Sequence, residues 1–266
     1  MPKIRRFLRV STSRRTAAIA LLALTAALGL GAKCIQGTSV HVDKDGYTHI
    51  TGEMVNDTDV QGVRIMLRAT LSDEQGNVVA TKDGPTCPPD TQPHSLIMFD
   101  IRFDNPNVPP WATYDVRPIS GQALVAPLAD PDIAVTRTEA IRFEGIPPIP
   151  GLPISDNDVL MAFGVRNRSG HVLEGVQGCA ALYDNHGAIV AANTGELAEL
   201  DEHNVPHPAT FHTEAPATAF FIFKDVPKGP TQVRGWLWFG PKGAPTSAYQ
   251  FFSTPMITIQ TEHKAV

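Results

Sequence analysis

Apolar and polar residues alternate along much of the chain, which is the pattern of β-strands that bury one face in a core. In the clearest run, Ile65, Leu67, Ala69 and Leu71 lie on one face, and positions 66, 68 and 70 lie on the other. The alternation returns at 176–182, and no stretch beyond residue 32 repeats its apolar positions with the 3.6-residue period of a helix. The sequence therefore predicts an all-β protein after its N-terminal segment.

Shorter apolar runs predict the remaining strands. They cover residues 96–103, 114–117 and 139–143 in the first half and 219–223, 233–239 and 255–259 in the second half. Turn residues separate such runs at intervals of roughly 8 to 12 residues, and units of about 100 residues with this spacing are typical of immunoglobulin-like sandwiches. We expect antiparallel β-sandwiches in which two sheets hide one face in each other.

One set of turn and core residues occurs twice. Residues 54–80 match residues 165–191 at a constant spacing of 111 positions. Seven positions are identical: Asn56 and Asn167, Ala69 and Ala180, Leu71 and Leu182, Asp73 and Asp184, Gly76 and Gly187, Val79 and Val190, and Ala80 and Ala191. Such a match indicates duplication of one structural unit. We therefore expect two tandem sandwiches, at residues 36–145 and 158–262, with 139–143 as the last strand of the first.

The duplicated polar residues are suited to turns. In each copy Asp-x-x-Gly separates two apolar runs, so Asp73 and Asp184 each start a type I turn whose glycine takes a positive φ. Asn56 and Asn167 both begin Asn-x-Ser/Thr, a glycosylation acceptor motif, but we favour a turn in which the side chain bonds nearby backbone groups. The carboxylates at positions 43 and 45 resemble the start of a calcium loop without its later ligands, and we interpret them as a hairpin turn.

A proline-rich stretch separates the two copies. Residues 146–153 contain four prolines. Proline fixes φ and removes a backbone donor, so we expect residues 146–157 to form an extended, fairly stiff linker.

Residues 1–32 have the composition of an export signal. Six basic residues precede an uncharged apolar run of 17 residues, from Thr16 to Ala32. That length is at the lower limit of about 17 to 25 residues for a membrane-spanning helix, so a retained anchor is an alternative to a cleaved signal peptide. Lipidation of Cys34 is a third alternative, because small residues precede it, although Lys33 interrupts the usual motif. We expect an exported protein, secreted or attached to the cell envelope, that meets the membrane only through this segment.

The net charge argues against nucleic-acid binding. Residues 1–32 hold six of the 22 Lys and Arg and none of the 27 Asp and Glu, so cleavage would move the formal net charge from −5 to −11. A chain this acidic repels phosphate backbones, and no basic stretch remains to offset that repulsion.

The three cysteines all lie beyond residue 32. Disulfides persist in exported proteins, but an odd number leaves at least one cysteine free, lipidated or paired between chains. Cys87 and Cys179 occupy different positions in the two copies, so a bond between them would join the two sandwiches. The alternative is a pair of buried or unpaired thiols.

The motifs of the repeat resemble a known family. Asn-x-Ser/Thr follows a first strand, an alternating strand then ends in Leu182-Tyr183-Asp184, and x-x-Gly-x-Ile/Val-Val-Ala follows. This order is similar to the FxLYD domain of bacterial exported and membrane-anchored proteins. Copy one has Leu71-Ser72-Asp73 and so lacks the aromatic residue. The resemblance implies a β-sandwich accessory or binding module in the envelope, and it transfers no catalytic residues.

Two clusters are candidates for binding. His203, His207 and His212 lie within ten residues, and neutral imidazole is a common ligand for zinc, copper or nickel, so a metal site is one interpretation and a solvated loop is the other. Trp236 and Trp238 share one face of a predicted strand. With Trp111 they are candidates for a partner surface, although a strand that is apolar on both faces is more often buried in or between sandwiches.

No catalytic or cofactor-binding motif is visible. The sequence contains no Gly-x-Ser-x-Gly elbow, His-Glu-x-x-His motif or phosphate-binding glycine loop. We expect a non-enzymatic protein without a cofactor that binds an envelope protein or a surface polymer. The alternatives are an extracytoplasmic metal-binding protein and an unrecognised hydrolase.

Overall fold

The computed structural model describes residues 35–43, 45–124, 133–145, 154–168, 170, 172–174, 176–203, 205–212, 214–224, 226, 228–239 and 250–263. This part of the chain is all-β, as expected, and contains no helix. The expected signal or anchor at 1–32, Cys34 and most of the linker lie outside the described residues. Within the described part, no helix is long and apolar enough to cross a membrane.

The first six strands form the first sandwich. They are β1 (Ile35–Val42), β2 (Thr48–Val55), β3 (Gln61–Ser72), β4 (Val78–Cys87), β5 (Leu96–Arg102) and β6 (Thr113–Leu124). Their pairing order is β1-β2-β5-β4-β3-β6. The order folds into two layers because only the end of β4, at Thr86 and Cys87, pairs with β5, while the rest of β4 pairs with β3. Apolar side chains of alternate residues, such as Ile50, Leu67 and Phe99, fill the space between the layers.

The second sandwich also has two main sheets. The outer sheet has the order β13-β12-β15-β8-β7-β19 and the inner sheet the order β11-β10-β16-β17, with β18 also paired to β16. The outer strands are β7 (Ile133–Glu144), β8 (Val159–Asn167), β12 (Ala198–Leu200), β13 (Pro206–Pro208), β15 (Pro216–Phe223) and β19 (Gln260–His263). The inner strands are β10 (Gln177–Tyr183), β11 (Ile189–Glu196), β16 (Gln232–Phe239), β17 (Gln250–Ser253) and β18 (Ile257–Thr258). The short strands β9 (Leu173–Glu174) and β14 (Thr210–Phe211) pair separately, and β19 joins β7 in parallel.

The two sandwiches share one strand topology. β2 pairs with β5 as β8 pairs with β15, and β3 lies between β4 and β6 as β10 lies between β11 and β16. β4 reaches over to β5, and the chain after β11 likewise reaches over to β15 through β12. These equivalences agree with the duplication inferred from the sequence. β9, β13, β14 and β17–β19 have no counterpart among the described strands of the first sandwich.

One strand belongs to a different sandwich from the one we expected. We assigned residues 139–143 to the first unit, but β7 pairs with β8, from Ile133 opposite Asn167 to Arg142 opposite Val159. Ala140 of β7 lies in the core of the second sandwich. β7 is therefore the first strand of the second sandwich, equivalent to β1, and residues 133–145 move from the first unit to the second. The expected linker at 146–157 consequently lies between β7 and β8 within the second unit and does not join the two sandwiches. Alternation identifies a strand, but it does not identify the sheet that the strand joins.

The expected turn chemistry is confirmed. The Asp73 side chain accepts hydrogen bonds from the amides of Gln75 and Asn77 at 3.0 and 2.8 Å, and Gly76 has a φ of 82°. Asp184 does the same in the second copy, and Asp43 does so in the hairpin between β1 and β2. The glycine is required because a side chain at this positive φ is strained.

The two repeated asparagines also serve turns. The Asn56 amide donates to the carbonyls of Val60 and Gln92 at 2.8 and 3.0 Å, and the Asn167 amide donates to the carbonyl of Phe211 at 2.8 Å. Both side chains are buried, which fits a structural role and not a surface acceptor for a glycan.

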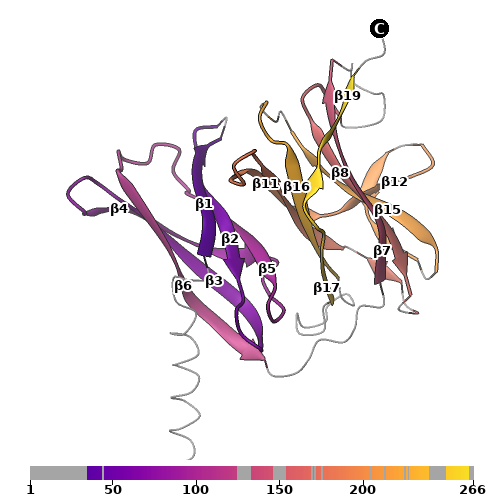
Figure 1. Cartoon of the computed structure of the whole chain (residues 1–266), viewed down its shortest axis with the longest axis horizontal. Helices are drawn as coiled ribbons and strands as arrows, with labels where there is room; N and C mark the ends of the chain where they lie inside the picture. The colour runs from indigo at the N-terminus through magenta and orange to yellow at the C-terminus, as the bar shows by residue number, and fades with distance from the viewer. Residues whose placement is uncertain are drawn as a thin grey trace, which may run out of the picture.

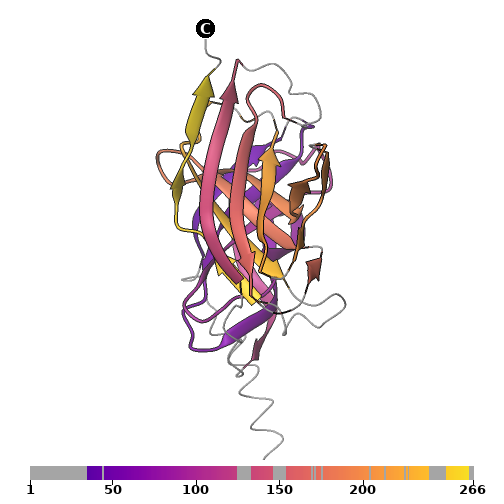
Figure 2. The ribbon, with the colours of Figure 1, turned by 90° about the vertical axis from the view of Figure 1, so that its right-hand side faces the viewer.

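The sandwiches stack face to face, so the molecule consists of four layers of strands (Figure 1). The order runs from β3, β4 and β6 through β1, β2 and β5 to the inner sheet and then the outer sheet of the second sandwich. Figure 2 looks onto the outer sheet, with β7 and β8 in front. The two central layers contact each other, so the molecule has an apolar cluster within each sandwich and a third between them.

Gly235 tests how tightly the second core is packed. A Cβ atom at this position would lie 2.8 Å from the terminal carbons of Met161 and Phe163. We expect Gly235→Ala to lower the free energy of unfolding by about 1–3 kcal/mol, because overpacking forces side chains out of their rotamers. Urea unfolding measures this loss. Thr218→Ala on an exposed position of β15 is the control and should change the free energy by less than about 0.5 kcal/mol; equal effects would contradict the packing described.

Candidate functional site

The interface between the two sandwiches gathers most of the residues that the sequence singles out. Its apolar centre consists of Cys87 and Met98 from the first sandwich and of Cys179, Ala181, Tyr183, Ile189, Trp236 and Trp238 from the second. All of these side chains are at least nine-tenths buried. The interface is therefore a third core of the molecule and not a loose contact.

Strands β10 and β16 form this interface because both of their faces are apolar. Alternate side chains of the two strands face the first sandwich: Cys179, Ala181 and Tyr183 on β10, and Trp236 and Trp238 on β16. Their neighbours Ala180, Leu182, Val233 and Leu237 lie in the core of the second sandwich. Successive side chains of a strand point to opposite sides, so each strand contributes to two cores.

The predicted partner-binding tryptophans lie in different places. Trp236 and Trp238 are buried between the sandwiches, so an external partner does not reach them in this arrangement. The Trp236 indole N–H donates to the Leu96 carbonyl of the first sandwich at 2.7 Å. Trp111 lies half-buried beside the first core, with its ring edge-on to Tyr114.

A carboxylate of the first sandwich bonds two side chains of the second. Glu53 Oε1 accepts a hydrogen bond from the Tyr183 hydroxyl at 2.7 Å and lies 3.5 Å from Nη1 of Arg234. Burial, together with the Glu53 carboxylate, raises the pKa of Tyr183 far above its usual range. The phenol therefore stays protonated at any physiological pH and remains a hydrogen-bond donor to Glu53.

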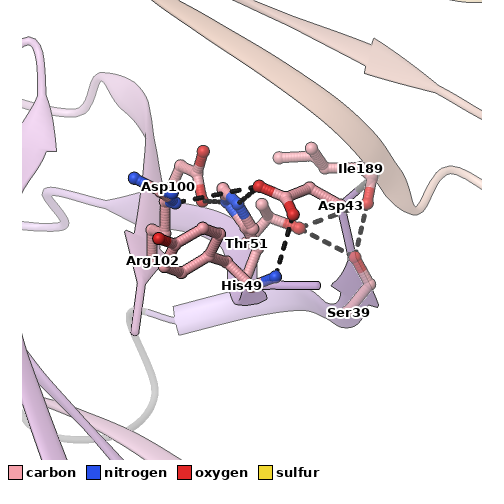
Figure 3. A network of polar contacts seen from close by, with 8 residues as sticks. Ser39, Asp43, His49, Thr51, Asp100, Arg102 and Ile189 are labelled. Atoms are coloured by element: carbon pink, nitrogen blue, oxygen red, sulfur yellow. Dashed lines mark hydrogen bonds and ion pairs between the residues drawn. The ribbon is translucent and has the colours of Figure 1, made fainter. Parts of the chain in front are cut away.

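Two hydroxyl groups of the first sandwich meet one carbonyl of the second (Figure 3). Ser39 donates to the Ile189 carbonyl oxygen. The Thr51 hydroxyl lies 3.2 Å from the same oxygen and 2.9 Å from Ser39 Oγ, so its single proton can serve either acceptor. Ile189 begins β11, so these contacts fix an edge strand of the inner sheet against β1 and β2.

An imidazole held by two carboxylates lies beside these hydroxyls. His49 Nδ1 is 2.8 Å from Asp100 Oδ1, and His49 Nε2 is 3.3 Å from Asp43 Oδ2. A ring that bonds carboxylates through both nitrogens donates from both, so this geometry favours the charged form. The Arg102 guanidinium lies 3.7 Å from Asp43 Oδ2 and stacks 3.5 Å from the centre of the Tyr47 ring.

The two histidines of this network respond to pH in opposite directions. Burial alone would lower the pKa of His49, but its bonds with Asp100 and Asp43 outweigh burial and raise the pKa above its ordinary value. The His41 ring stacks on His49 with the ring centres 4.9 Å apart. Burial and then the neighbouring His49 charge lower the pKa of His41. The stack therefore favours one charged ring, His49, over two charged rings.

Of the two alternatives for Cys87 and Cys179, the structure shows the pair of buried thiols, and it places them together. Cys87 and Cys179 are free thiols. Cys87 ends β4 opposite Met98, and Cys179 lies on β10 opposite Trp236. Burial, followed by the neighbouring Cys87 thiol, raises the pKa of the Cys179 thiol. The structure thus brings the pair to one point of the interface.

The three candidate metal ligands do not come together. His203 lies in the exposed turn before β13, where Asp201 accepts a hydrogen bond from the His203 amide at 2.8 Å. The His207 ring faces Glu199, with Nδ1 at 3.7 Å from Oε1, and His212 follows β14. Among the residues that the structure describes, no group of three or more His, Cys, Asp or Glu side chains is arranged to hold a metal ion. His203 lies in the turn, His207 lies on β13 and His212 follows β14, so the three rings belong to separate parts of this segment.

A surface groove lies beside this histidine segment. It has a volume of about 320 Å³, and its lining includes Glu199 and Leu200 of β12, Thr210, His212 and Phe220 of β15. Glu199 Oε1 accepts a hydrogen bond from the Thr210 amide at 2.9 Å, which fixes the carboxylate at one wall. The groove thus combines β12 and β15, which have counterparts in the first sandwich, with residues of β14 and the segment after it, which have none among its described strands.

Sequence reasoning missed the residues that bond the sandwiches together. The alternation along β2 could have indicated Glu53. Ile50 and Met54 face the core, so Glu53, His49 and Thr51 lie on the opposite face of the strand. The pairing of His49 with Asp100 was not detectable, because it depends on the register of β2 against β5.

Comparison with known proteins gives no family. No protein-family profile matches the chain, and no curated protein matches it. Solved structures share limited similarity: a penta-heme cytochrome c552 from Thermochromatium tepidum (11% identity, TM-score 0.25, 40% of this chain and 36% of that chain), a calcium-binding mutant of Bacteroides uniformis β-glucuronidase 2 (10%, 0.29, 84% and 28%) and a Bifidobacterium dentium β-glucuronidase complexed with coumarin-3-O-glucuronide (13%, 0.25, 80% and 39%). The chain thus spans well under half the length of each.

Trp236 tests the interface between the sandwiches. We expect Trp236→Ala to lower the free energy of unfolding by about 3–5 kcal/mol, because it removes a buried ring and leaves the Leu96 carbonyl without its donor. Small-angle scattering should also show a more extended particle. Tyr114→Ala, which removes an aromatic ring that is 36% exposed and lies outside the interface cluster, is the control. Unchanged stability and unchanged scattering for Trp236→Ala would contradict the packed interface.

A substitution of His49 tests the polar network, because its effect on stability should depend on pH. A raised pKa in the folded state means that the charged ring stabilises the fold fully below about pH 6.5, and that this contribution is lost as the pH rises through the folded pKa. His41, with its lowered pKa, acts in the opposite sense: its contribution is present above about pH 6.5 and is lost as the pH falls through the folded pKa. We expect His49→Gln to cost roughly 1.5–3 kcal/mol at pH 6 and clearly less at pH 9.

Urea unfolding at the two pH values measures this difference. His94→Gln is the control, because His94 is an exposed histidine that also lies beside a carboxylate, Asp59. An equal loss for His49→Gln at pH 6 and pH 9 would contradict the charged state assigned to the ring.

Proposed function

We propose that the chain is a non-enzymatic exported protein of the cell envelope that acts as a rigid binding or structural module. The packed interface between the sandwiches is the observation that supports this proposal most strongly. Interfaces between domains that move are usually small and polar. Here a buried apolar centre joins the two sandwiches, and hydrogen bonds also cross the interface: Tyr183 donates to Glu53, Trp236 donates to the Leu96 carbonyl and Ser39 donates to the Ile189 carbonyl. Such a body suits a role in holding a partner at a fixed position.

The groove beside β12 and β15 is the best candidate for the partner's contact. The repeated residues serve turns and cores, so specific binding is expected from elements that the copies do not share. Two aliphatic side chains are exposed here: Leu200, which lines the groove and is 38% exposed, and Val205, which precedes the strand residue paired with Leu200 and is 51% exposed. Exposed aliphatic side chains next to a groove favour a protein partner over a sugar polymer. The resemblance to FxLYD domains implies the same kind of accessory role.

Photo-crosslinking in intact cells tests this proposal. A benzophenone amino acid is placed at position 200 or 205 of the full chain, with position 78 of the first sandwich as the control, because Val78 is also aliphatic and 61% exposed. We expect a discrete adduct with an envelope protein from positions 200 and 205 and none from position 78. Leu200→Asp, combined with the label at 205, should reduce that adduct at least tenfold.

Three outcomes would contradict the proposal. Equal labelling from all three positions would mean that the groove has no special role. An adduct with a polymer alone would assign a different partner class. Recovery of the chain from the cytoplasm would contradict export.

A further inference from the structure

The two thiols at the sandwich interface are placed by separate strands that meet only in the folded molecule. Cys87 is the last residue of β4, at the point where β4 crosses to β5. Cys179 lies in the middle of β10, on the face opposite the core of its own sandwich. Both belong to the same apolar cluster, and the Cys87 side chain lies close enough to the Cys179 thiol to act on its pKa. Disulfide formation needs Cα atoms within about 7 Å and converging Cβ atoms, so it is open only to cysteines that already pack together in the folded molecule, as this pair does.

We propose that Cys87 and Cys179 form a disulfide bond that locks the two sandwiches together when the chain meets a disulfide oxidant. The inference rests on the proposed export, because disulfides persist outside the reducing cytosol. It goes beyond the proposed function, because it adds a covalent bond to a site that packing alone defines in the structure.

The chemistry is thiol–disulfide exchange with an oxidant that itself carries a disulfide. The Cys87 thiol loses its proton and attacks one sulfur of the oxidant, which releases one oxidant thiol and leaves a mixed disulfide on Cys87. The Cys179 thiol then loses its proton and attacks the Cys87 sulfur, which releases the second oxidant thiol. Two thiols of the protein are oxidised, and one disulfide of the oxidant is reduced to two thiols that carry the two protons.

The order of these steps follows from exposure. Cys87 retains 9% of its accessible surface, whereas Cys179 retains none. Burial also raises the pKa of Cys179, so it forms little thiolate in the docked molecule. The oxidant therefore reaches Cys87 first, at the edge of the interface or before the sandwiches dock, and Cys179 completes the bond as docking brings it into contact.

The bond would link residues 92 positions apart, on two different sandwiches. A cross-link over such a long segment restricts the unfolded chain strongly, so it stabilises the folded state more than a short loop does. It also prevents the sandwiches from separating even where noncovalent contacts at the interface are lost.

Oxidation of the purified full chain with glutathione disulfide tests the bond. We expect an intramolecular species that migrates faster on a non-reducing gel and has lost the mass of two hydrogen atoms. Peptide mapping should join the Cys87 and Cys179 peptides, and the thermal midpoint should rise by roughly 5–15 °C relative to the reduced chain. Cys87→Ala and Cys179→Ala should each abolish this species, whereas Cys34→Ser should retain it. Comparison of the oxidised and reduced wild-type chains needs no variant, so the test holds even where an alanine variant fails to fold.

Persistence of two free thiols after oxidation, or bonds only between chains through Cys34, would overturn the proposal.

A second experiment alkylates the chain in intact cells before lysis. Protection of Cys87 and Cys179 from alkylation until a reductant is added would support the bond in its natural setting. If the bond forms in the purified chain but both cysteines are reduced in cells, the proposed export fails and the inference fails with it. The crosslinking result at positions 200 and 205 is independent of both cysteines, so the two proposals can fail separately.

Discussion

The inner sheet of the second sandwich has two apolar faces, and both must be kept from water. One face packs on its own partner sheet, as in any sandwich. The other, which carries Trp236, Trp238 and Tyr183, would expose a large apolar patch on an isolated sandwich. Docking on β2 and β5 removes this exposure, so the four-layer arrangement follows from the sequence of β10 and β16. The proline-rich stretch at 146–153 does not connect the sandwiches, because the strands before and after it, β7 and β8, pair in one sheet of the second sandwich.

Polar groups make the docking specific to one position. Glu53 meets Tyr183, the Trp236 indole meets a backbone carbonyl, and Ser39 meets the start of β11. A buried polar group that loses its partner costs about 1–3 kcal/mol. A slide of one sheet over the other would break these bonds together, whereas the apolar centre alone would tolerate some displacement. The histidine and carboxylate network beside Ser39 then holds the hairpin between β1 and β2, from which Ser39 reaches the second sandwich.

Much of the fold was predictable, because it depends on local periodicity. Alternation identified the strands, and Asp-x-x-Gly identified the hairpins. The membership of β7 was not predictable, because alternation is the same whichever sheet a strand joins. The contact between Cys87 and Cys179 could be raised only as one alternative, and the Glu53 and His49 contacts were missed, since they depend on register and on docking between residues far apart in the chain. The histidine segment has a ligand-like composition, but its hairpin geometry keeps the rings apart.

The two copies of the docking face have diverged at matching positions. Arg68 is the counterpart of Cys179 at the repeat spacing of 111 residues. Cys179 lies opposite Trp236, whereas Arg68 lies opposite Arg117. Arg68 also forms an exposed ion pair with Asp83. The sandwiches thus meet head to tail, since the face of one copy covers a non-equivalent face of the other. Head-to-tail contacts give rings when the rotation between units closes and open-ended arrays when it does not. Because Arg68 and Arg117 stand where the second copy has Cys179 and Trp236, the first copy does not offer the same apolar docking face to a further unit.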